Sequence, residues 1–461
     1  MAGISSPGLG SGLDINGIVT KLMQIESQPL TVLAQREASY QAKLSAYGSL
    51  QGALSSLQTA AKTLASTSTF TGMSASVSDS TVLSAAATST AVAGTYDIAV
   101  SKLAKANAMH TNVDYGTDTF DTGTLRITIG TGTPVDINLT TATTLSGIRD
   151  AINSGNAGVT ATIINDGTAD RLTLTSNTTG TVGAITIAAP TTNNDGTRRL
   201  TDLIGANLTV DQVAQNAELT LNGIAISRSS NTITDAITGV TLNLTKADIA
   251  TPPTARLTVA KNTGAVTSAV SAFVKAYNDA VGQMKTMTAY DAVNKKASVL
   301  TGDSTARTIQ AQLTSMVGAA VTGVAGGISR LSDIGVAMQK DGTLLTDSSK
   351  LSAALSDTTK DVTTLFTSTT SGNQGIAVRF NTLLEGIVGS GGMISSRKDG
   401  INASIKDIGK RGEALNLRLA QIEKRYRAQF TALDTLVAGM NSTSNYLTQQ
   451  LANLPSTSSS N

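Results

Sequence analysis

The chain has 461 residues, a formal net charge of +2 at pH 7, one histidine and no cysteine. These numbers exclude disulfide scaffolds, cysteine-ligated zinc, thiol nucleophiles and multi-histidine metal sites. A net charge of +2 is too small to create a field that would attract nucleic acid to the whole chain. No run of residues reaches the roughly 18 consecutive apolar residues of a membrane helix, so we expect no membrane insertion.

Charged residues make up 14% of the chain and aromatic residues 3%, both well below ordinary values, and Thr, Ser, Gly, Asn and Ala take their place. That mixture is typical of exposed strands and turns. The length allows two to four domains, each with its own core. The N-terminus has no basic segment followed by an apolar core, because its first lysine is Lys21, so if the protein leaves the cell we expect it to do so without a cleaved Sec-type signal.

The first 65 residues predict two helices. Asp14 is a plausible N-cap of a short, largely apolar helix, and Gln28 marks its end because the residue before a proline avoids the helical conformation. Pro29 then suits the first position of a helix that runs to about Ala65. This second helix carries an apolar seam with steps of three and four: Tyr40, Leu44, Tyr47, Leu50, Leu54, Leu57, Ala61 and Leu64. The short helix is either an ordinary packed helix or a segment that orders only on another subunit.

From Val77 to about Val259 the period changes to short alternating runs separated by turn residues, which indicates β-rich structure. One short helix is expected after Thr144, and Asn222 with Gly223 predicts a tight turn between two strands. Ile233 and Ile237, four residues apart, suit one or two helical turns.

Helical spacing returns at Thr263, and the following helix has the apolar seam Val266, Val270, Phe273, Tyr277, Val281 and Met284. Asp303 is expected to cap another helix, and Asp347 and Asp357 to cap two short ones. One small hairpin, with its turn at residues 340–342, is expected between the helix that Asp303 caps and the helix that Asp347 caps.

The C-terminal stretch has the longest heptad pattern of the chain, which requires a partner helix. Its apolar positions are Ile401, Ile405, Ile408, Leu415, Leu419, Ile422, Tyr426, Leu433, Leu436, Met440, Leu447 and Leu454. We therefore predict an α+β multidomain fold in which the N- and C-terminal helices pack as a coiled-coil-like leg domain, with β-rich domains inserted between them. The expected intrachain seam consists of Tyr40, Leu44, Tyr47, Leu54, Leu57, Val270, Phe273, Tyr277, Leu415, Leu419 and Ile422.

Three possible chemical sites have simpler explanations, and the first, His110 alone, is best explained as a surface or turn residue. Gly302, Asp303 and Ser304 are similar to the nucleophile block of some esterases, but His110 has no matching aspartate at the expected offset, so Asp303 is better explained as a helix cap. Between Arg397 and Arg427 nine basic residues face four acidic ones, which fits a solvated helix face better than a nucleic-acid site. We expect no catalytic, cofactor or metal site, and therefore no enzyme.

Several segments resemble the bacterial flagellar filament-capping family, also called the hook-associated protein 2 family. They are the opening "GISSPGLGSGLDINGIVTKLMQIESQPL", then "YQAKLSAYGSLQGALSSL", "SVLTGDSTAR", "LSDIGVAMQKDGTLLTDSSKL" and the closing "YRAQFTALDTLVAGMNSTSNYLTQQL". The segment "TLSGIRDAINSGNAGVTATIINDGTADRLTLTS" is similar to the hook-type insertion motif of flagellar axial proteins.

The resemblance implies terminal leg segments at 1–39 and 431–461, flexible in the monomer, and a helical domain at 40–76 and 261–430. It also implies one β-rich head domain at 77–115 and 213–260 and a second at 116–212, which holds the insertion motif. The implied function is a cap of about five copies at the filament tip that helps exported flagellin fold and insert. The implied partners are flagellin, the hook-filament junction proteins and an export chaperone on the C-terminal helix.

Contacts with filament subunits are expected from apolar leg residues at both ends of the chain: Ile15, Ile18, Leu22, Met23, Leu436, Met440, Leu447 and Leu451. Two alternatives stay open. One is another axial component, such as a hook-filament junction protein, and the opening glycine-rich stretch followed by Asp14 and Pro29 favours a cap instead. The other is a secreted adhesin whose threonine-rich head binds a host glycan or surface.

Overall fold

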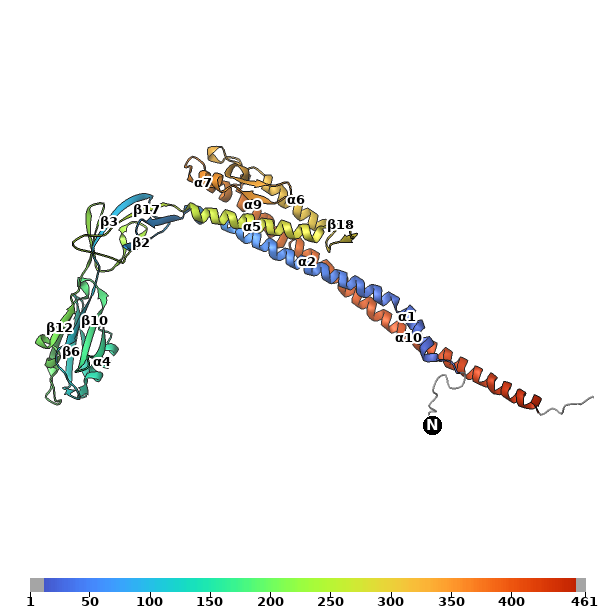
Figure 1. Ribbon diagram of the computed structural model, residues 1–461, viewed down its shortest axis with the longest axis horizontal. Coiled ribbons are helices and arrows are strands. Elements are labelled where there is room, and N and C mark those ends of the chain that lie inside the picture. Colours follow the sequence, from blue (N-terminus) through green and yellow to red (C-terminus); the bar gives the residue numbers. More distant parts are fainter. Residues whose placement is uncertain (1–11, 453–461) are drawn as a thin grey trace, which may run out of the picture. The chain divides into compact units, whose positions relative to one another are not determined.

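The computed structural model describes residues 12–452 and divides the chain into two compact units. The helical unit comprises the chain before Ser68 together with the chain from Val266 onward, and the strand unit comprises Ser68–Ala265 (Figure 1). Helices from the two ends of the chain thus belong to one unit, and the strand-rich middle is inserted between them. The predicted fold class is confirmed.

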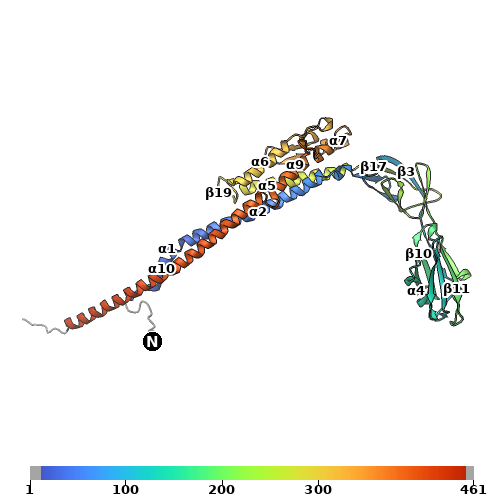
Figure 2. The same ribbon diagram turned by 180° about the vertical axis from the view of Figure 1, so that it is seen from behind.

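The helical unit is built around two long helices. α2 (Gln28–Ala65) and the 60-residue α10 (Met393–Ala452) lie side by side, and α1 (Ile15–Glu26) continues along α10 (Figures 1 and 2). The remaining elements are α5 (Thr263–Thr288), α6 (Ser304–Gly318), α7 (Ser348–Ser356), α8 (Val362–Thr367), α9 (Ile376–Val388), and the hairpins of β18 (Tyr290–Asp291) with β19 (Lys296–Ala297) and β20 (Val336–Met338) with β21 (Leu344–Thr346).

The ends of these helices follow local chemistry closely. Asp14 caps α1 by accepting from the amide of Gly17, as predicted. The break after α1 lies at Ser27 and not at Gln28, because the amide of Ser27 closes the last turn of α1 and Pro29 sits inside the first turn of α2. The four-residue α3 (Ser68–Thr71) then opens the strand unit.

Aspartate caps begin three of the shorter helices. Asp303 caps α6 and Asp347 caps α7, both as predicted. The prediction for Asp357 was wrong, because this residue ends α7 while α8 is capped by Asp361 four residues later. The hydroxyl of Thr364, three residues after Asp361, donates to its carboxylate and completes this cap.

Apolar seams meet in the core of the helical unit. Phe273 of α5 packs edge to face on Phe380 of α9, with ring centroids 5.1 Å apart. The buried members of the predicted seams are Tyr47, Leu50, Leu54, Leu57, Ala61, Leu64, Val266, Val270, Phe273, Tyr277, Val281, Met284, Ile401, Ile408 and Leu419. Tyr40, Leu44, Leu415 and Ile422 are half-buried. The predicted intrachain seam is therefore most completely buried where α2, α5 and α9 contribute to the core.

A partly buried polar cluster joins three helices of this unit. The hydroxyl of Tyr47 on α2 donates to Asp303 Oδ1 at 2.6 Å, and Arg397 Nη2 on α10 lies 3.0 Å from Asp303 Oδ2. Burial opposes ionisation of Asp303, but the hydrogen bonds from Tyr47, from the α6 amides and from Arg397 outweigh it and hold its pKa below the usual value. Asp303 thus caps α6 and links it to α2 and α10.

The strand unit contains two separate cores. In the first, a five-stranded antiparallel sheet in the order β1-β17-β3-β13-β14 faces a three-stranded sheet in the order β15-β16-β2. Its strands are β1 (Met73–Val77), β2 (Leu83–Ala87), β3 (Gly94–Lys102), β13 (Ala217–Leu221), β14 (Ile224–Arg228), β15 (Thr232–Ile237), β16 (Val240–Leu244) and β17 (Thr254–Lys261).

The second core lies between a four-stranded sheet in the order β12-β4-β10-β9, a three-stranded sheet in the order β11-β6-β7, and α4 (Leu145–Ser154). The strands are β4 (Ala106–Thr111), β6 (Gly123–Ile129), β7 (Val135–Leu139), β9 (Val159–Asn165), β10 (Asp170–Thr179), β11 (Ile185–Thr192) and β12 (Leu208–Gln212), and the short pair β5 (Thr119–Phe120) and β8 (Thr143–Thr144) adds to them.

Two predictions for the strand unit differ from the structure. Ile233 and Ile237 belong to strand β15 and not to a helical turn. The predicted boundaries after residues 76 and 115 do not coincide with the cores, since β1 begins at Met73 and β4 pairs with β10 and β12 of the second core. The runs MSASV and ANAMHT lack the strong apolar alternation that would have identified them as strands.

Two buried tyrosines predict a specific alkaline transition. Burial, together with the hydrogen bond to Asp303, raises the pKa of Tyr47 from 10.0 to about 12, and burial likewise raises that of Tyr115 to about 12. The fold therefore favours the neutral phenols, a contribution that is complete below pH 10 and is lost as the pH rises toward 12. We expect the phenolate absorbance, which no tryptophan obscures, to keep rising up to about pH 12. A Tyr47→Phe variant should lose part of this last phase, and an unchanged phase would contradict the assignment.

Candidate interaction surface

The predicted contact residues of α1 lie mostly against α10. Ile15 and Val19 are buried, with 2% and 1% of their surface exposed, and Ile18, Leu22 and Met23 are half-buried. Two polar contacts strengthen the packing: Tyr426 OH lies 3.1 Å from Glu26 Oε1, and Arg427 Nη1 lies 2.9 Å from Asn16 Oδ1. Most of the apolar face of α1 is thus already used within the helical unit.

The C-terminal end of α10 differs from α1, because its apolar side chains are exposed to solvent. The exposed fractions are 61% for Leu436, 64% for Met440, 53% for Leu447 and 67% for Leu451. Their spacing of four, seven and four residues places them on one face of the helix. We call these four residues the α10 stripe. An apolar row of this kind on a solvent-exposed helix is typical of a surface that binds another protein.

The surroundings of the α10 stripe favour apolar contact as well. Every residue from 439 to 452 is exposed, and Asp434 is the only charged residue in the last 22 residues of α10, from Thr431 to Ala452. Tyr446, with 60% of its surface exposed, adds an aromatic ring that the sequence analysis did not select. Its place in the heptad pattern is not an apolar seam position, so periodicity alone could not identify it.

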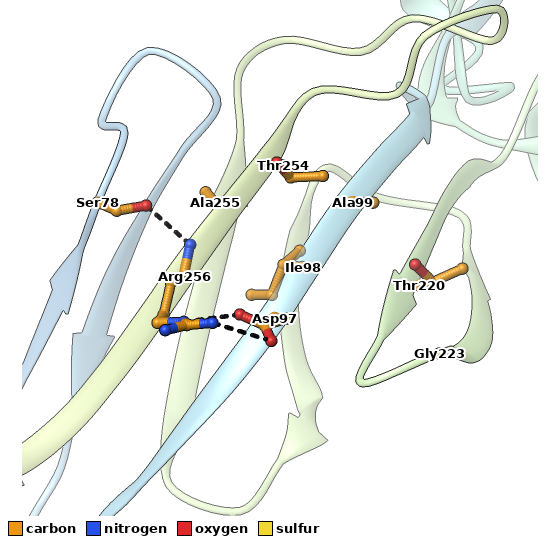
Figure 3. A pocket seen from close by; sticks show the side chains of 9 residues that line it. All are labelled: Ser78, Asp97, Ile98, Ala99, Thr220, Gly223, Thr254, Ala255 and Arg256. Carbon is orange, nitrogen blue, oxygen red and sulfur yellow. Dashed lines mark hydrogen bonds and ion pairs between the residues drawn. The ribbon is translucent and has the colours of Figure 1, made fainter.

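The strand unit offers a hollow on its five-stranded sheet (Figure 3). Its volume is about 580 Å³, and strands β3, β13 and β17 line it. The charged groups in it are paired with each other: Arg256 Nε lies 2.8 Å from Asp97 Oδ1, and the hydrogen bond from Arg256 lowers the pKa of Asp97. The amide of Arg256 also donates to Ser78 Oγ at 2.8 Å. Arg256 and Asp97 therefore neutralise each other, and neither is an unpaired charge that could bind a ligand.

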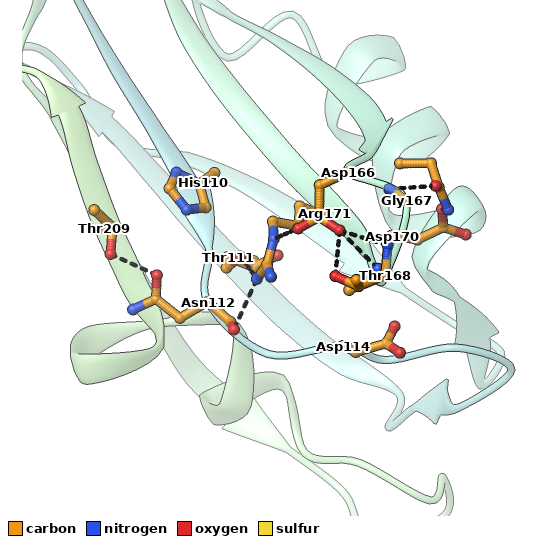
Figure 4. Close-up of polar contacts among 12 residues, drawn as sticks. His110, Thr111, Asn112, Asp114, Asp166, Gly167, Thr168, Asp170, Arg171 and Thr209 are labelled. Atoms are coloured by element: carbon orange, nitrogen blue, oxygen red, sulfur yellow. Dashed lines mark hydrogen bonds and ion pairs between the residues drawn. The ribbon is translucent and has the colours of Figure 1, made fainter.

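A polar network ties the β9–β10 turn to β4 (Figure 4). Asp166 accepts hydrogen bonds from the hydroxyl and amide of Thr168, from the amide of Ala169 and from Arg171 Nε. These bonds, led by the Thr168 hydroxyl, hold the pKa of Asp166 far below its usual value. Arg171 also donates to the carbonyls of Thr111 and Asn112, so the network serves to fix the turn.

None of the three possible chemical sites considered from the sequence is assembled as an active site. His110 lies half-buried on strand β4 with its Nδ1 2.8 Å from Asp211, not in a turn. The carboxylate of Asp303 is occupied by Tyr47, Arg397 and the α6 amides. Within residues 12–452, no group of histidine, cysteine, aspartate or glutamate could hold a metal ion. In the same range no helix is long and apolar enough to cross a membrane.

The basic residues of α10 are largely paired or solvated. Arg411 lies 2.8 Å from Asp407 and Arg427 lies 2.8 Å from Glu423, both at i,i+4 spacing, and Arg397 pairs with Asp303. Ion pairs of this kind are typical of a solvated helix surface.

Comparison with known proteins identifies the family. Family models match both ends of the chain, "Flagellar hook-associated protein 2 N-terminus" at residues 11–107 and "Flagellar hook-associated protein 2 C-terminus" at residues 214–442. The model "Flagellin hook IN motif" matches residues 124–178, which include β7, β8, α4, β9 and most of β6 and β10.

Complete relatives and a solved structure agree with these matches. Flagellar hook-associated protein 2 of Escherichia coli O157:H7 is 37% identical over 98% of this chain and 99% of its own length. The A-type flagellar hook-associated protein 2 of Pseudomonas aeruginosa is 34% identical over 97% of both chains. The crystal structure of the D1-D2-D3 domains of the flagellar cap protein FliD from Escherichia coli is similar with a TM-score of 0.58 and 34% identity, covering 77% of this chain and 99% of that one. The chain therefore belongs to the flagellar hook-associated protein 2 family.

Proposed function

We propose that this protein caps the flagellar filament. In this function several copies assemble at the distal end of the filament, outside the cell, and promote the folding and insertion of exported flagellin, which would otherwise be lost to the medium. The α10 stripe is the observation that carries the proposal. Its four apolar side chains are exposed in the single chain, so they are available for exchangeable contacts with filament subunits.

The partners follow from the same surface. Flagellin and the hook-filament junction proteins are the filament components that the α10 stripe would contact, with α1 contributing mainly through its half-buried residues Ile18, Leu22 and Met23. Before export the same stripe needs protection from water and from other chains, which a flagellar export chaperone on the C-terminal helix would supply. We propose that about five copies form a homo-oligomer at the filament tip. Each copy would travel there through the flagellar export channel.

Neither alternative is favoured. A hook-filament junction protein would share helical ends and a strand-rich middle, but the models that match both ends of this chain are those of hook-associated protein 2. An adhesin would need a binding site for a host glycan or surface. The hollow in Figure 3 does not favour this function, because its charged residues are paired with each other.

The proposal is tested by deleting the gene in the bacterium that encodes this chain. We expect cells without filaments and abundant unpolymerised flagellin in the medium, measured by immunoblot against total flagellin. The full chain should restore filaments, and a chain that ends before Leu436 should not. Normal filaments with altered surface attachment in the deletion strain would overturn the cap proposal and favour the adhesin.

A further inference from the structure

Met440, a member of the α10 stripe, is the most exposed methionine in the described part of the chain. Nine of the ten methionines, all except Met1, lie within residues 12–452. Met440 is 64% exposed, whereas Met109 and Met284 are 6% and 1% exposed and the other six are half-buried. A dissolved oxidant therefore reaches the side chain of Met440 more easily than that of any other described methionine.

Oxygen added to the sulfur of Met440 would alter the α10 stripe and not the fold. Methionine sulfoxide is polar, whereas the thioether that it replaces is apolar. In the single chain every residue from 439 to 452 is exposed, so the added oxygen stays in water. When the stripe docks, the oxygen would lie between Leu436 and Leu447 and against apolar groups of the partner, where it loses its hydrogen bonds to water. Oxidation therefore disfavours docking while the helix stays intact.

We propose that Met440 makes the α10 stripe sensitive to oxidation: hydrogen peroxide converts this residue to methionine sulfoxide, and the oxidised copy docks on filament subunits about tenfold more weakly. The inference rests on the proposed capping function, in which the stripe is the contact surface. Because the contacts are exchangeable, the stripe is uncovered between docking events, and Met440 is then open to peroxide.

The reaction is a two-electron transfer of oxygen from the peroxide to the thioether. The sulfur of Met440 attacks one peroxide oxygen, so that a sulfur–oxygen bond forms and the oxygen–oxygen bond breaks. The departing hydroxide takes the proton of the transferred hydroxyl group and leaves as water. The sulfur is oxidised to the sulfoxide and the peroxide is reduced, and no further reactant is needed.

The reactivity of Met440 can be measured on the full chain by mass spectrometry after trypsin cleavage. Arg427 is the last basic residue of the chain, so peptide 428–461 contains Met440 as its only methionine, and peptide 106–126 contains only Met109. We expect peroxide to oxidise Met440 at least about tenfold faster than Met109 in the folded chain, and at the same rate in guanidinium chloride. Equal rates in the folded chain overturn the proposal.

Docking is tested with the same peptide in a single sample. The full chain is oxidised until about half of Met440 is sulfoxide and is mixed with sheared, uncapped filaments reassembled from flagellin of the same bacterium, which are then pelleted. We expect Met440 sulfoxide to be depleted about tenfold in the pelleted chains relative to the unbound ones. Sulfoxide at the half-buried Met73, the only methionine of peptide 63–102, should be equal in both fractions. Equal Met440 sulfoxide in the two fractions overturns the proposal.

A Met440→Leu variant, compared only with its own untreated sample, assigns the effect to this residue. Peroxide should leave the filament binding of this variant unchanged, since leucine has no thioether. A loss as large as in the original chain would overturn the proposal, and the pelleting comparison on the original chain decides the question if the variant does not bind. A chain that fails to bind filaments before any oxidation contradicts the capping function itself, whereas binding that is indifferent to Met440 oxidation contradicts this inference alone.

Discussion

Replacing Leu447 by aspartate is expected to abolish filament growth while both units of the chain stay folded. Leu447 is 53% exposed and lies in the part of α10 where every residue from 439 to 452 is exposed, so its side chain adds little to the fold of the single chain. In the cap, a carboxylate on the α10 stripe would have to be buried against apolar partners, at a cost of at least about 2 kcal/mol per contact. Every copy of the oligomer would lose this binding free energy, and weak, exchangeable contacts have too little binding free energy to compensate for the loss.

The matched control is Gln449→Asp, which puts the same charge two residues further along the helix and therefore on nearly the opposite face. We expect Gln449→Asp cells to carry filaments, while Leu447→Asp cells release monomeric flagellin at the level of the deletion strain. Free flagellin in the medium and filament counts by electron microscopy are measured together, with circular dichroism of the purified variants as the test of folding. If Leu447→Asp cells grow normal filaments, the α10 stripe is not the contact surface.

The architecture could be predicted because its elements rest on long periodic patterns. The heptad seam of α2 and the seam of α5 each extend over several turns, so local errors did not matter, and Asn222 with Gly223 located the turn between β13 and β14. Short elements were less certain. Ile233 and Ile237 are four residues apart, a spacing that puts both side chains on one face of a helix and equally on one face of a strand. Only the pairing of β15 with β16 distinguishes the two.

Contacts between distant residues could not be predicted from periodicity. The sequence left open whether α1 packs within the chain, because its partner Tyr426 is 400 residues away from Glu26. Similarly, Asp303 was recognisable as a cap from its own neighbours, but Tyr47 lies 256 residues before it and Arg397 lies 94 residues after it. The exposure of the α10 stripe also needed the structure, because a heptad pattern alone indicates a partner helix without showing where that partner ends.

Replacing Asp303 by alanine is expected to destabilise the helical unit by about 3 kcal/mol. Loss of the N-cap of α6 accounts for about 1 kcal/mol. The rest, about 2 kcal/mol, comes from leaving the buried hydroxyl of Tyr47 and the guanidinium of Arg397 without their acceptor. The side chain of Asp303 is only 5% exposed and Tyr47 is fully buried, so water cannot easily replace the bond that the Tyr47 hydroxyl loses.

Asp347→Ala is the matched control for this prediction. Asp347 caps α7 through the amides of Ser349 and Lys350, but its side chain is 48% exposed and it reaches no distant helix by a hydrogen bond. Its loss should therefore cost only the cap, about 1 kcal/mol. The free energy of unfolding of each variant is measured with guanidinium chloride, following the helical signal by circular dichroism. Equal losses for the two variants would mean that the bonds from Tyr47 and Arg397 add nothing to stability. A larger loss for Asp303→Ala would mean that one carboxylate holds α2, α6 and α10 together, which keeps the base of α10 rigid while the α10 stripe at its far end stays free for partners.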